Sequence, residues 1–380
     1  MGMASNSTTF RIVISGYYGF RNSGDEAVLR SILLALQEQG ERANVTIVPI
    51  VLSNDPASTT AMYGVESMPR MHPASLWKAI KSADALISGG GSLLQDATGK
   101  KTIPYYTGVI KLAQWLGKPT FIYAQGLGPV NSRAMFPFIS SAMKKSSYIS
   151  VRDEQSAQFL RNIGVVKQPI EVVPDPVMGM PLPDQQTNWK VIEQDKPVIG
   201  VSVRFWPSDR KELDYIVEAL IKLINERDVH IRFLPFHMPD DVEASRYVHD
   251  LIVPHLNDSS TVEIADVEDD PQQMLLAVSQ CDVLFGMRLH ALIYAANQRV
   301  PLLGLSYDPK IDQFLERIGS EAIGSTDQLN ADQFTAQVVK LLDGKEKWKT
   351  EKEPYISQLI EQSQKPAQQL IQFLRQNISR

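Results

Sequence analysis

Short apolar runs alternate with segments of helical spacing along most of the chain. Arg11–Ser15 predicts a buried strand, and Gly24–Gln39 places its aliphatic residues on one face of a helix. The alternation continues through the first half, with strands predicted at Val45–Val51, Ala85–Ser88, Thr120–Ala124, Tyr148–Val151 and Ile170–Val173. Helices are predicted between them at Ile103–Leu116, Ala134–Lys145 and Glu154–Ile163.

A second alternation fills the other half of the chain. Strands are predicted at Val198–Val203, Ile231–Pro235, Val262–Ile264, Val283–Phe285 and Leu302–Leu305, and one long amphipathic helix at Tyr355–Gln376. Between the halves, Met178–Lys196 is rich in Pro, Asp and Gln, which is typical of a linker. We therefore expect an N-terminal domain over 1–180, a linker over 181–196, a C-terminal domain over 197–350 and a terminal helix over 351–380.

Strands that alternate with helices are typical of parallel sheets covered by helices on both faces. Two such halves predict an α/β chain of two Rossmann-like domains facing a cleft. In open α/β sheets, ligands bind beyond the carboxyl ends of the strands. The residues that directly follow each strand are therefore the candidates for chemistry.

Composition narrows the class of protein. The 380 residues suit two domains, and a net charge of −5 gives no reason to expect nucleic-acid binding. The single cysteine, Cys281, permits no disulfide within the chain and fits a reducing compartment. Met1–Phe10 does not resemble a signal peptide, and no run of about 18 apolar residues occurs. We expect a cytoplasmic protein with at most peripheral membrane contact.

Three glycine-containing loops follow strands of the first half, at Gly16–Glu26, Gly89–Asp96 and Gln125–Pro129. Glycines let a ligand approach the backbone, and acidic residues at a helix start suit a hydroxyl-rich ligand such as a sugar better than a phosphate. The candidate residues for binding such a sugar are Tyr18, Asn22, Asp25, Gly90, Gly91, Gln95 and Asp96. The first loop is equally compatible with an ordinary turn that caps the following helix.

Cationic side chains follow strands of the second half. Arg288 and His290 come between a predicted strand and a helix that begins near Leu289, where free N–H groups and the helix dipole favour an anion. Arg288 adds a bidentate donor for carboxylate or phosphate, and His290 can donate or transfer a proton. Arg204 and Lys310 follow two other strands and are further candidate cations.

Ordinary structural roles remain open for three of these residues. Arg204 is equally placed for a surface ion pair, and His290 for a hydrogen-bonded structural histidine. His237 follows another strand and either takes part in chemistry or ties down its loop.

Four of these segments resemble the polysaccharide pyruvyltransferase family. The resemblance extends to about Tyr307–Lys310 and is carried by G-Y-Y-G-F-R-N-S-G-D-E-A at Gly16–Ala27, S-G-G-G-S-L-L-Q-D at Ser88–Asp96, Q-G-L-G-P at Gln125–Pro129 and G-M-R-L-H-A at Gly286–Ala291. The motifs look most like those of the bacterial enzymes that pyruvylate the secondary cell-wall polymer anchoring S-layer proteins. The resemblance implies a glycosyltransferase-B-like fold and phosphoenolpyruvate (PEP) as donor. It places PEP contacts at Arg204, Arg288, Leu289 and His290, to which Lys310 is added by its position.

The resemblance also implies a reaction, the transfer of a pyruvyl group from PEP to N-acetylmannosamine of a lipid-linked disaccharide as a 4,6-ketal. Arg204 and Arg288 would hold the two anionic groups of PEP, and His290 would act as general acid. Asp25 or Asp96 would activate the acceptor hydroxyl. No cofactor and no metal is expected, and a lipid-linked acceptor would be met at the inner face of the cell membrane.

Two alternatives belong to other classes of protein. A sugar-nucleotide-dependent glycosyltransferase of the same fold would use Arg288 and His290 to hold a diphosphate. A non-catalytic binding protein for acidic glycans would use the same cations without turnover.

Overall fold

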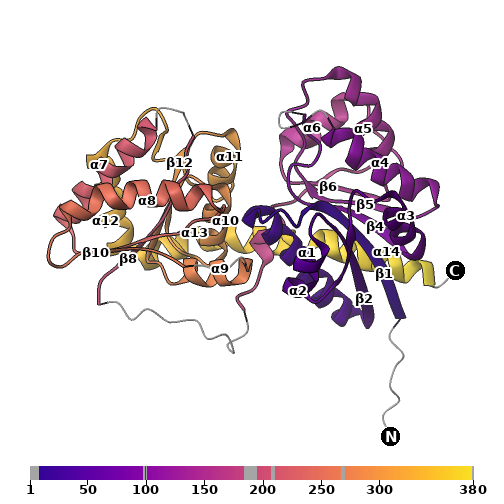
Figure 1. Cartoon of the computed structure of the whole chain (residues 1–380), viewed down its shortest axis with the longest axis horizontal. Coiled ribbons are helices and arrows are strands. Elements are labelled where there is room, and N and C mark those ends of the chain that lie inside the picture. The colour runs from indigo at the N-terminus through magenta and orange to yellow at the C-terminus, as the bar shows by residue number, and fades with distance from the viewer. Residues whose placement is uncertain are drawn as a thin grey trace, which may run out of the picture. The chain divides into compact units, whose positions relative to one another are not determined.

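The computed structural model describes residues 8–96, 99, 101–183, 195–206, 210–266 and 270–378. Most of the predicted linker, residues 184–194, lies outside the described residues. The chain divides into two compact units (Figure 1). Unit 1 comprises the described residues of Met1–Met180 and Leu359–Arg380, and unit 2 those of Pro181–Gln358.

Unit 1 is built on a parallel seven-stranded sheet in the order β3-β2-β1-β4-β5-β6-β7. Its strands are β1 (Thr8–Tyr18), β2 (Val45–Ser53), β3 (Glu66–Pro69), β4 (Ala85–Gly89), β5 (Thr120–Gln125), β6 (Tyr148–Val151) and β7 (Glu171–Val172). The central strands are buried and mostly apolar because helices cover both faces of the sheet.

The helices of unit 1 form two layers. They are α1 (Ser23–Ala43), α2 (Pro56–Tyr63), α3 (Pro73–Ser82), α4 (Thr102–Trp115), α5 (Phe136–Met143), α6 (Glu154–Asn162) and α14 (Lys365–Ile378), with 3-10 turns η1 (Arg133–Met135) and η2 (Pro176–Gly179). The α3–α6 helices share one apolar core with alternate strand residues such as Val13. The opposite layer contains α1 and α14, which pack against each other, and Phe373 of α14 contacts Phe121 of β5 (Figure 1).

Unit 2 repeats the design with a parallel six-stranded sheet in the order β10-β9-β8-β11-β12-β13. Its strands are β8 (Val198–Ser202), β9 (His230–Phe233), β10 (Thr261–Ile264), β11 (Val283–Gly286), β12 (Leu302–Ser306) and β13 (Gly324–Ser325). Its helices are α7 (Lys211–Glu226), α8 (Asp240–Ile252), α9 (Pro271–Ser279), α10 (Leu289–Asn297), α11 (Pro309–Arg317), α12 (Ala331–Asp343) and most of α13 (Lys345–Ser363), with a 3-10 turn η3 (Val253–His255).

The C-terminal segment differs from the prediction of one helix over Tyr355–Gln376. It forms two helices, because α13 already begins at Lys345 and α14 starts anew at Lys365. Pro366, the second residue of α14, accounts for the break, since it has no backbone N–H to continue the hydrogen bonds of α13. The residues from Leu359 onward belong to unit 1.

Apart from this terminal helix, the strands and helices predicted from the hydrophobic pattern are present, with ends that shift by a few residues. The pattern predicted no element in 54–84, where the structure has α2, β3 and α3, and it also missed β13. Both missed strands lie at sheet edges and are short and partly exposed, so they lack the apolar run of a central strand.

Candidate active site

Each sheet reverses its strand order at one place, between β1 and β4 in unit 1 and between β8 and β11 in unit 2. Such a reversal leaves a crevice at the carboxyl edge of the sheet, and ligands of open α/β folds bind there. The predicted residues are distributed around these two places. Those proposed for the sugar follow β1 and β4, while Arg204 follows β8 and the Arg288 segment follows β11.

Arg288 is held by a buried carboxylate. It is the N-cap residue of α10, and its Nε donates to Asp241 Oδ2 at 3.0 Å while Nη2 donates to Oδ1. Asp241 is fully buried in the first turn of α8, and its Oδ2 also accepts the backbone N–H groups of Phe236 and His237, at 3.1 and 2.9 Å. This pairing uses the Nε–Nη2 edge of the guanidinium, so the Nη1 end is the one on which an anion could bind.

The first turn of α10 follows directly. The N–H of Leu292 donates to the carbonyl of the N-cap residue Arg288 at 3.3 Å, which closes the first turn of the helix, so the N–H of Leu289 lies at its positive end. No acidic residue occupies this turn, in contrast to the first turn of α1. The positive end of the α10 dipole is therefore not compensated from within the helix. The side chains of Leu289 and His290 are half-buried.

Arg204 lies beyond β8, the strand that pairs with β11. Its Nη1 donates to the hydroxyl of Tyr307 at 2.9 Å, and its guanidinium carbon lies 5.1 Å from the ring of Trp206 and 5.2 Å from that of Tyr307. These aromatic contacts orient the cation. Tyr307 follows β12, and Trp206 follows Arg204 closely. The sequence analysis selected neither for the anion site, because both side chains are neutral.

The two other candidate residues of unit 2, Lys310 and His237, follow β12 and β9. Lys310 is half-buried in the first turn of α11, where its backbone N–H donates to the N-cap residue Asp308 at 2.9 Å. The His237 side chain is 34% exposed, and its Nδ1 lies 3.8 Å from Asp240 Oδ2. The backbone contact of His237 with Asp241 ties its loop to α8.

On unit 1, two predicted residues have local structural partners. The Tyr18 side chain is buried, and its hydroxyl donates to the carbonyl of Gly89 at 3.0 Å, which joins β1 to the loop after β4. Asn22 is the N-cap of α1 and accepts the N–H of Gly24 at 3.1 Å, as one of the sequence interpretations expected.

Asp25 lies against the glycine loop after β4. A Cβ at Gly91 would come within 2.6 Å of Asp25 Oδ1, so only glycine allows this approach, and Gly91 has a φ of +66°. Burial is the main cause that raises the pKa of Asp25 to about 7; Arg152 opposes the rise, and Glu26 and Asp175 add to it. A carboxylate with this pKa is suited to accept a proton near neutral pH.

Arg152 is a cation of this edge that the sequence analysis missed. It follows β6, its Nη2 donates to Ser92 Oγ at 2.7 Å, and its Nη1 lies 3.6 Å from Asp175 Oδ2. Only the tertiary structure brings it to Ser92, which lies 60 residues earlier in the chain.

Asp96 and Gln95 are both half-buried at the end of the same loop. Asp96 accepts three hydrogen bonds, from the backbone N–H of Asn131 and of Ser132, both at 2.8 Å, and from Asn131 Nδ2 at 3.0 Å. These bonds, led by the one from the Asn131 N–H, lower the pKa of Asp96. A carboxylate held by these hydrogen bonds is a weaker base than Asp25. This difference favours Asp25 over Asp96 as the base, a choice that the sequence left open.

An aromatic face lies beside this edge. The rings of Tyr17 and Phe20 stack at 3.9 Å, and Tyr17 is 39% exposed. Arg70, which follows β3 and is buried, lies 5.8 and 5.2 Å from these two rings and donates through Nη2 to the Tyr106 hydroxyl at 3.1 Å. Flat aromatic faces of this kind suit the apolar face of a sugar ring.

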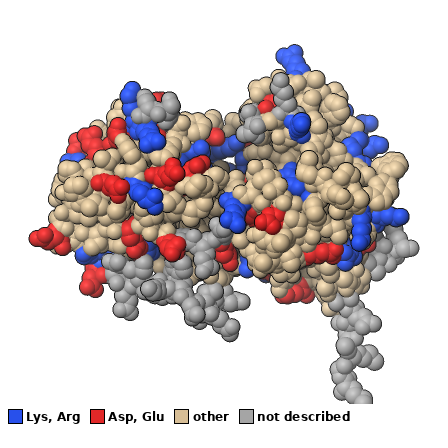
Figure 2. All heavy atoms as spheres, viewed as in Figure 1, with Lys and Arg blue, Asp and Glu red and all other residues tan. Residues whose placement is uncertain are grey.

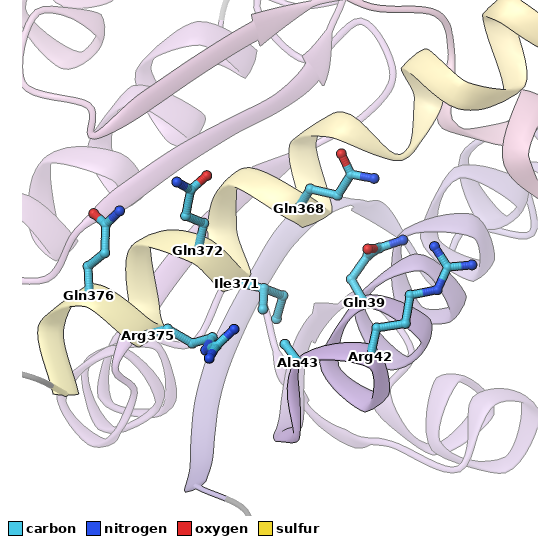
Figure 3. A pocket seen from close by; sticks show the side chains of 8 residues that line it. All are labelled: Gln39, Arg42, Ala43, Gln368, Ile371, Gln372, Arg375 and Gln376. Carbon is cyan, nitrogen blue, oxygen red and sulfur yellow. The ribbon is translucent and has the colours of Figure 1, made fainter.

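Among the described residues, no group of three or more His, Cys, Asp or Glu side chains is arranged to hold a metal ion. No helix in the described part of the chain is long and apolar enough to cross a membrane. A pocket of about 480 Å³ lies between α1 and α14, lined by the side chains in Figure 3. It contains none of the predicted site residues, because it surrounds the last turns of α1, opposite the end that carries Asp25.

Solved structures with the same architecture include a UDP-GlcNAc 2-epimerase, a glycosyltransferase and a protein bound to UDP-glucose. The UDP-GlcNAc 2-epimerase of Methanocaldococcus jannaschii is 14% identical over 97% of this chain and 99% of that chain, with a TM-score of 0.66. A glycosyltransferase from Rickettsia africae is 14% identical over 99% and 98%, with a TM-score of 0.62. The Anabaena protein HepE, solved with UDP-glucose, is 11% identical over 97% and 100%, with a TM-score of 0.58.

At these identities the likeness defines the fold, and the predicted glycosyltransferase-B-like class of two Rossmann-like domains is confirmed. The sequence itself is more specific. A family model described as "Polysaccharide pyruvyl transferase" matches residues 22–309. The chain therefore belongs to the polysaccharide pyruvyl transferase family, and it is a transferase. None of the curated proteins matches this chain.

Proposed function

We propose that this transferase takes the pyruvyl group from PEP and attaches it to two hydroxyls of a saccharide as a cyclic ketal. The observation that carries the proposal is the geometry of Arg288. A buried carboxylate fixes this arginine at a helix N-terminus that contains no acidic residue, directly after the strand at which the sheet of unit 2 reverses its order. Such a place suits a small ligand with more than one negative charge.

PEP is such a ligand, because it joins a carboxylate and a phosphate on one enol carbon. Arg288 and the N–H groups at the start of α10 would bind one anionic group, and Arg204, oriented by Tyr307, would bind the other. Lys310 is a third candidate for neutralising phosphate as it leaves.

The reaction needs one proton donor on the PEP side. In the mechanism that we propose, protonated His290 gives a proton to the methylene carbon of PEP, and C2 becomes electrophilic. The oxygen of one sugar hydroxyl attacks C2 and loses its proton to a base. The second hydroxyl then forms the other C–O bond as the C2–O bond to phosphate breaks, and its proton leaves with the phosphate. The proton taken up by the base balances the one that His290 gave to the methylene carbon, so that the products are a ketal and inorganic phosphate.

The acceptor would bind at the carboxyl edge of unit 1. Asp25 is the preferred base, since its pKa of about 7 suits proton transfer at neutral pH. Gly90, Gly91 and Gln95 would offer backbone and amide groups to sugar hydroxyls, and the Tyr17–Phe20 face would stack on the ring. The preferred acceptor is a lipid-linked disaccharide ending in N-acetylmannosamine, modified at O4 and O6, for a cell-wall polymer that anchors S-layer proteins. The enzyme would act in the cytoplasm, at the inner face of the membrane.

The decisive experiment is mass spectrometry of a synthetic lipid-linked disaccharide after incubation with the protein and PEP. We expect a product heavier by one pyruvyl ketal and one phosphate released per ketal formed. Parallel reactions with nucleotide sugars test the rival chemistry. Transfer of a sugar from such a donor, with none from PEP, would mean that the protein is a conventional glycosyltransferase.

Two substitutions test the donor site. Arg288→Ala and His290→Ala should each lower turnover by about 10²–10³, which is typical for the loss of one preorganised electrostatic or proton-donating group. Arg227→Ala and His255→Ala are matched controls, because both residues are exposed on unit 2 away from the carboxyl edge, and they should leave turnover unchanged. Near-normal turnover in the folded Arg288 or His290 variant would remove that residue from the mechanism.

A further inference from the structure

The outer face of α3, α4 and α5 in unit 1 exposes large apolar side chains. Trp115 is 74% exposed and Trp77 is 38% exposed, and their ring centroids lie 5.5 Å apart, so they form one pair across α3 and α4. Phe138 of α5 is 55% exposed. Exposed aromatic residues grouped on adjacent helices are unusual on a soluble surface and mark an interaction site.

The same face is positively charged. From Met71 to Tyr148 the sequence has nine Lys and Arg residues and two Asp and Glu residues, although the whole chain carries a net charge of −5. The helices α3, α4 and α5 contain Lys78, Lys81 and Lys111 and no acidic residue, and Lys118 and Lys145 follow α4 and α5. Figure 2 shows Lys and Arg atoms along the outer edge of this unit, over the helices labelled α3 and α4 in Figure 1.

Contacts within this layer hold the charges close together. Lys111 Nζ donates to Ser141 Oγ at 2.8 Å, which connects the exposed faces of α4 and α5. The pKa of Lys111 is lowered, first by burial and then by the charge of Lys145, so these two ammonium groups are close enough to repel each other. An anionic partner would relieve that repulsion.

A hollow opens after the end of α4, where Gln114 and Gly117 line it. It has a volume of about 650 Å³ and is lined by Lys118 and Lys145 together with the apolar side chains of Phe10 and Phe373. Asp84 is the acidic residue of its lining, and its carboxylate accepts the backbone N–H of Arg11 at 2.8 Å. The hollow therefore combines two lysines with apolar side chains.

We propose that this Trp77–Trp115 surface, together with Lys78, Lys81, Lys111, Lys118 and Lys145, binds the surface of an anionic lipid bilayer. Tryptophan is amphipathic and prefers the depth of the lipid headgroups, where its ring is in the apolar layer and its N–H reaches polar groups. Lysines around such an anchor are attracted to anionic headgroups. Apolar insertion and charge attraction together give stable yet reversible attachment, which either signal alone does not.

Charge complementarity and the tryptophan pair favour a bilayer over the other possible occupants. A second copy of this acidic chain could cover the apolar rings, and a nucleic acid could meet the lysines. A copy that met this face with its own would bring lysines against lysines, and a nucleic acid would leave the indole rings in water. The inference does not rest on the proposed function, because it concerns residues that take no part in the candidate active site.

The test is sedimentation of the full chain with lipid vesicles. We expect binding to vesicles of phosphatidylcholine with about one third phosphatidylglycerol, weak binding to phosphatidylcholine alone, and loss of the charge-dependent part as salt is raised. Tryptophan emission should shift to shorter wavelength on binding. In Trp77→Ser/Trp115→Ser the shift should disappear and binding should weaken strongly. Replacing Lys78, Lys81 and Lys118 by Gln should weaken binding roughly 100-fold.

Matched control variants distinguish binding by this surface from a general effect of positive charge. Lys211, Lys340 and Lys347 are exposed on unit 2, and their triple replacement by Gln removes the same charge and should leave binding unchanged. Circular dichroism melting should show that each variant is folded. The inference is overturned if the tryptophan variant binds vesicles like the parent chain. It is also overturned if both lysine triples behave alike, or if the tryptophan change instead converts a lipid-free dimer into a monomer in light scattering.

Discussion

At the scale of single residues, the site of unit 2 depends on one carboxylate that the sequence did not single out. Asp241 accepts two backbone N–H groups and both donors of the Arg288 edge, and it is fully buried. Its neighbour Asp240 is 68% exposed. Two adjacent aspartates are equivalent in a sequence, and only burial shows which one orients the arginine.

We predict that Asp241→Asn lowers kcat/KM for PEP by up to about 10²-fold, because an amide nitrogen opposite the guanidinium lets Arg288 move from its position. Steady-state kinetics with varied PEP measure the effect. Asp240→Asn is the matched control and should behave like the parent enzyme. Equal kinetics for the two variants would show that Asp241 does not position Arg288 for catalysis.

Asp25 should make the stability of the protein depend on pH. Its pKa is about 7 in the fold and about 3.9 in an unfolded chain, so the folded chain binds more protons between these values. The contribution of Asp25 to the free energy of unfolding therefore falls as pH rises from about 4 to about 7. Asp25→Asn should be more stable than the parent chain by an amount that grows across this window and then stays constant, at most about 4 kcal/mol.

Thermal melting at several pH values measures this difference. Asp96→Asn should show the opposite slope, because hydrogen bonds lower the pKa of Asp96 in the fold. The stability that Asp96 contributes is present above its unfolded pKa and is lost as pH falls through the lower folded pKa. Parallel slopes for the two variants would contradict the assignment of Asp25 as a buried, protonatable group.

At the scale of elements, the hydrophobic pattern predicted the central strands well because both faces of each parallel sheet are covered. A strand buried on both sides reads as a continuous apolar run, as in β4 and β5. The edge strands β3 and β13 and the short helix α2 have no such pattern, and they form because neighbouring elements offer them partners.

The packing of α1 determines the conformation of the glycine loop that follows β4. Gly90 has a φ of +59°, and a Cβ there would lie 1.8 Å from Val28 Cγ1. We predict that Gly90→Ala lowers the free energy of unfolding by about 3 kcal/mol or more, since backbone strain adds to overpacking. Chemical denaturation measures the loss.

Gly64→Ala is the control that separates backbone strain from steric overlap. Gly64 ends α2 with a similar φ of +66°, but a Cβ there would meet nothing within 4 Å. Gly64→Ala should therefore lower the free energy of unfolding only through backbone strain, by about 1–2 kcal/mol. A Gly90 variant no less stable than the Gly64 variant would mean that the loop can move away from α1.

At the scale of the whole molecule, the C-terminus completes the first unit. Helix α13 begins in unit 2, and α14 packs in unit 1 on α1, β5 and β6. Leu370 of α14 is fully buried, whereas Gln372 is exposed. Leu370→Ala should destabilise unit 1 by about 2–5 kcal/mol, and Gln372→Ala should have little effect.

Differential scanning calorimetry checks this assignment. If the units unfold in separate transitions, Leu370→Ala should lower the temperature of one and leave the other unchanged. A shift of both transitions by the same amount would show that the units unfold as one cooperative body, contrary to the expectation. Variants of unit 2, such as Phe334→Ala in its core, should move the other transition.

The sequence by itself determined the fold class, the central strands and the family. These properties depend on residues close together in the sequence, since apolar periodicity involves near neighbours and the family motifs are short runs at strand ends. It also placed Arg288 and His290 at a helix N-terminus, which the structure has at α10. Tertiary structure alone decided that Asp241 holds Arg288, that Tyr307 orients Arg204, and that Arg152 reaches Ser92. These partners lie 47, 103 and 60 residues apart, and such contacts arise from the packing of whole elements rather than from any local pattern.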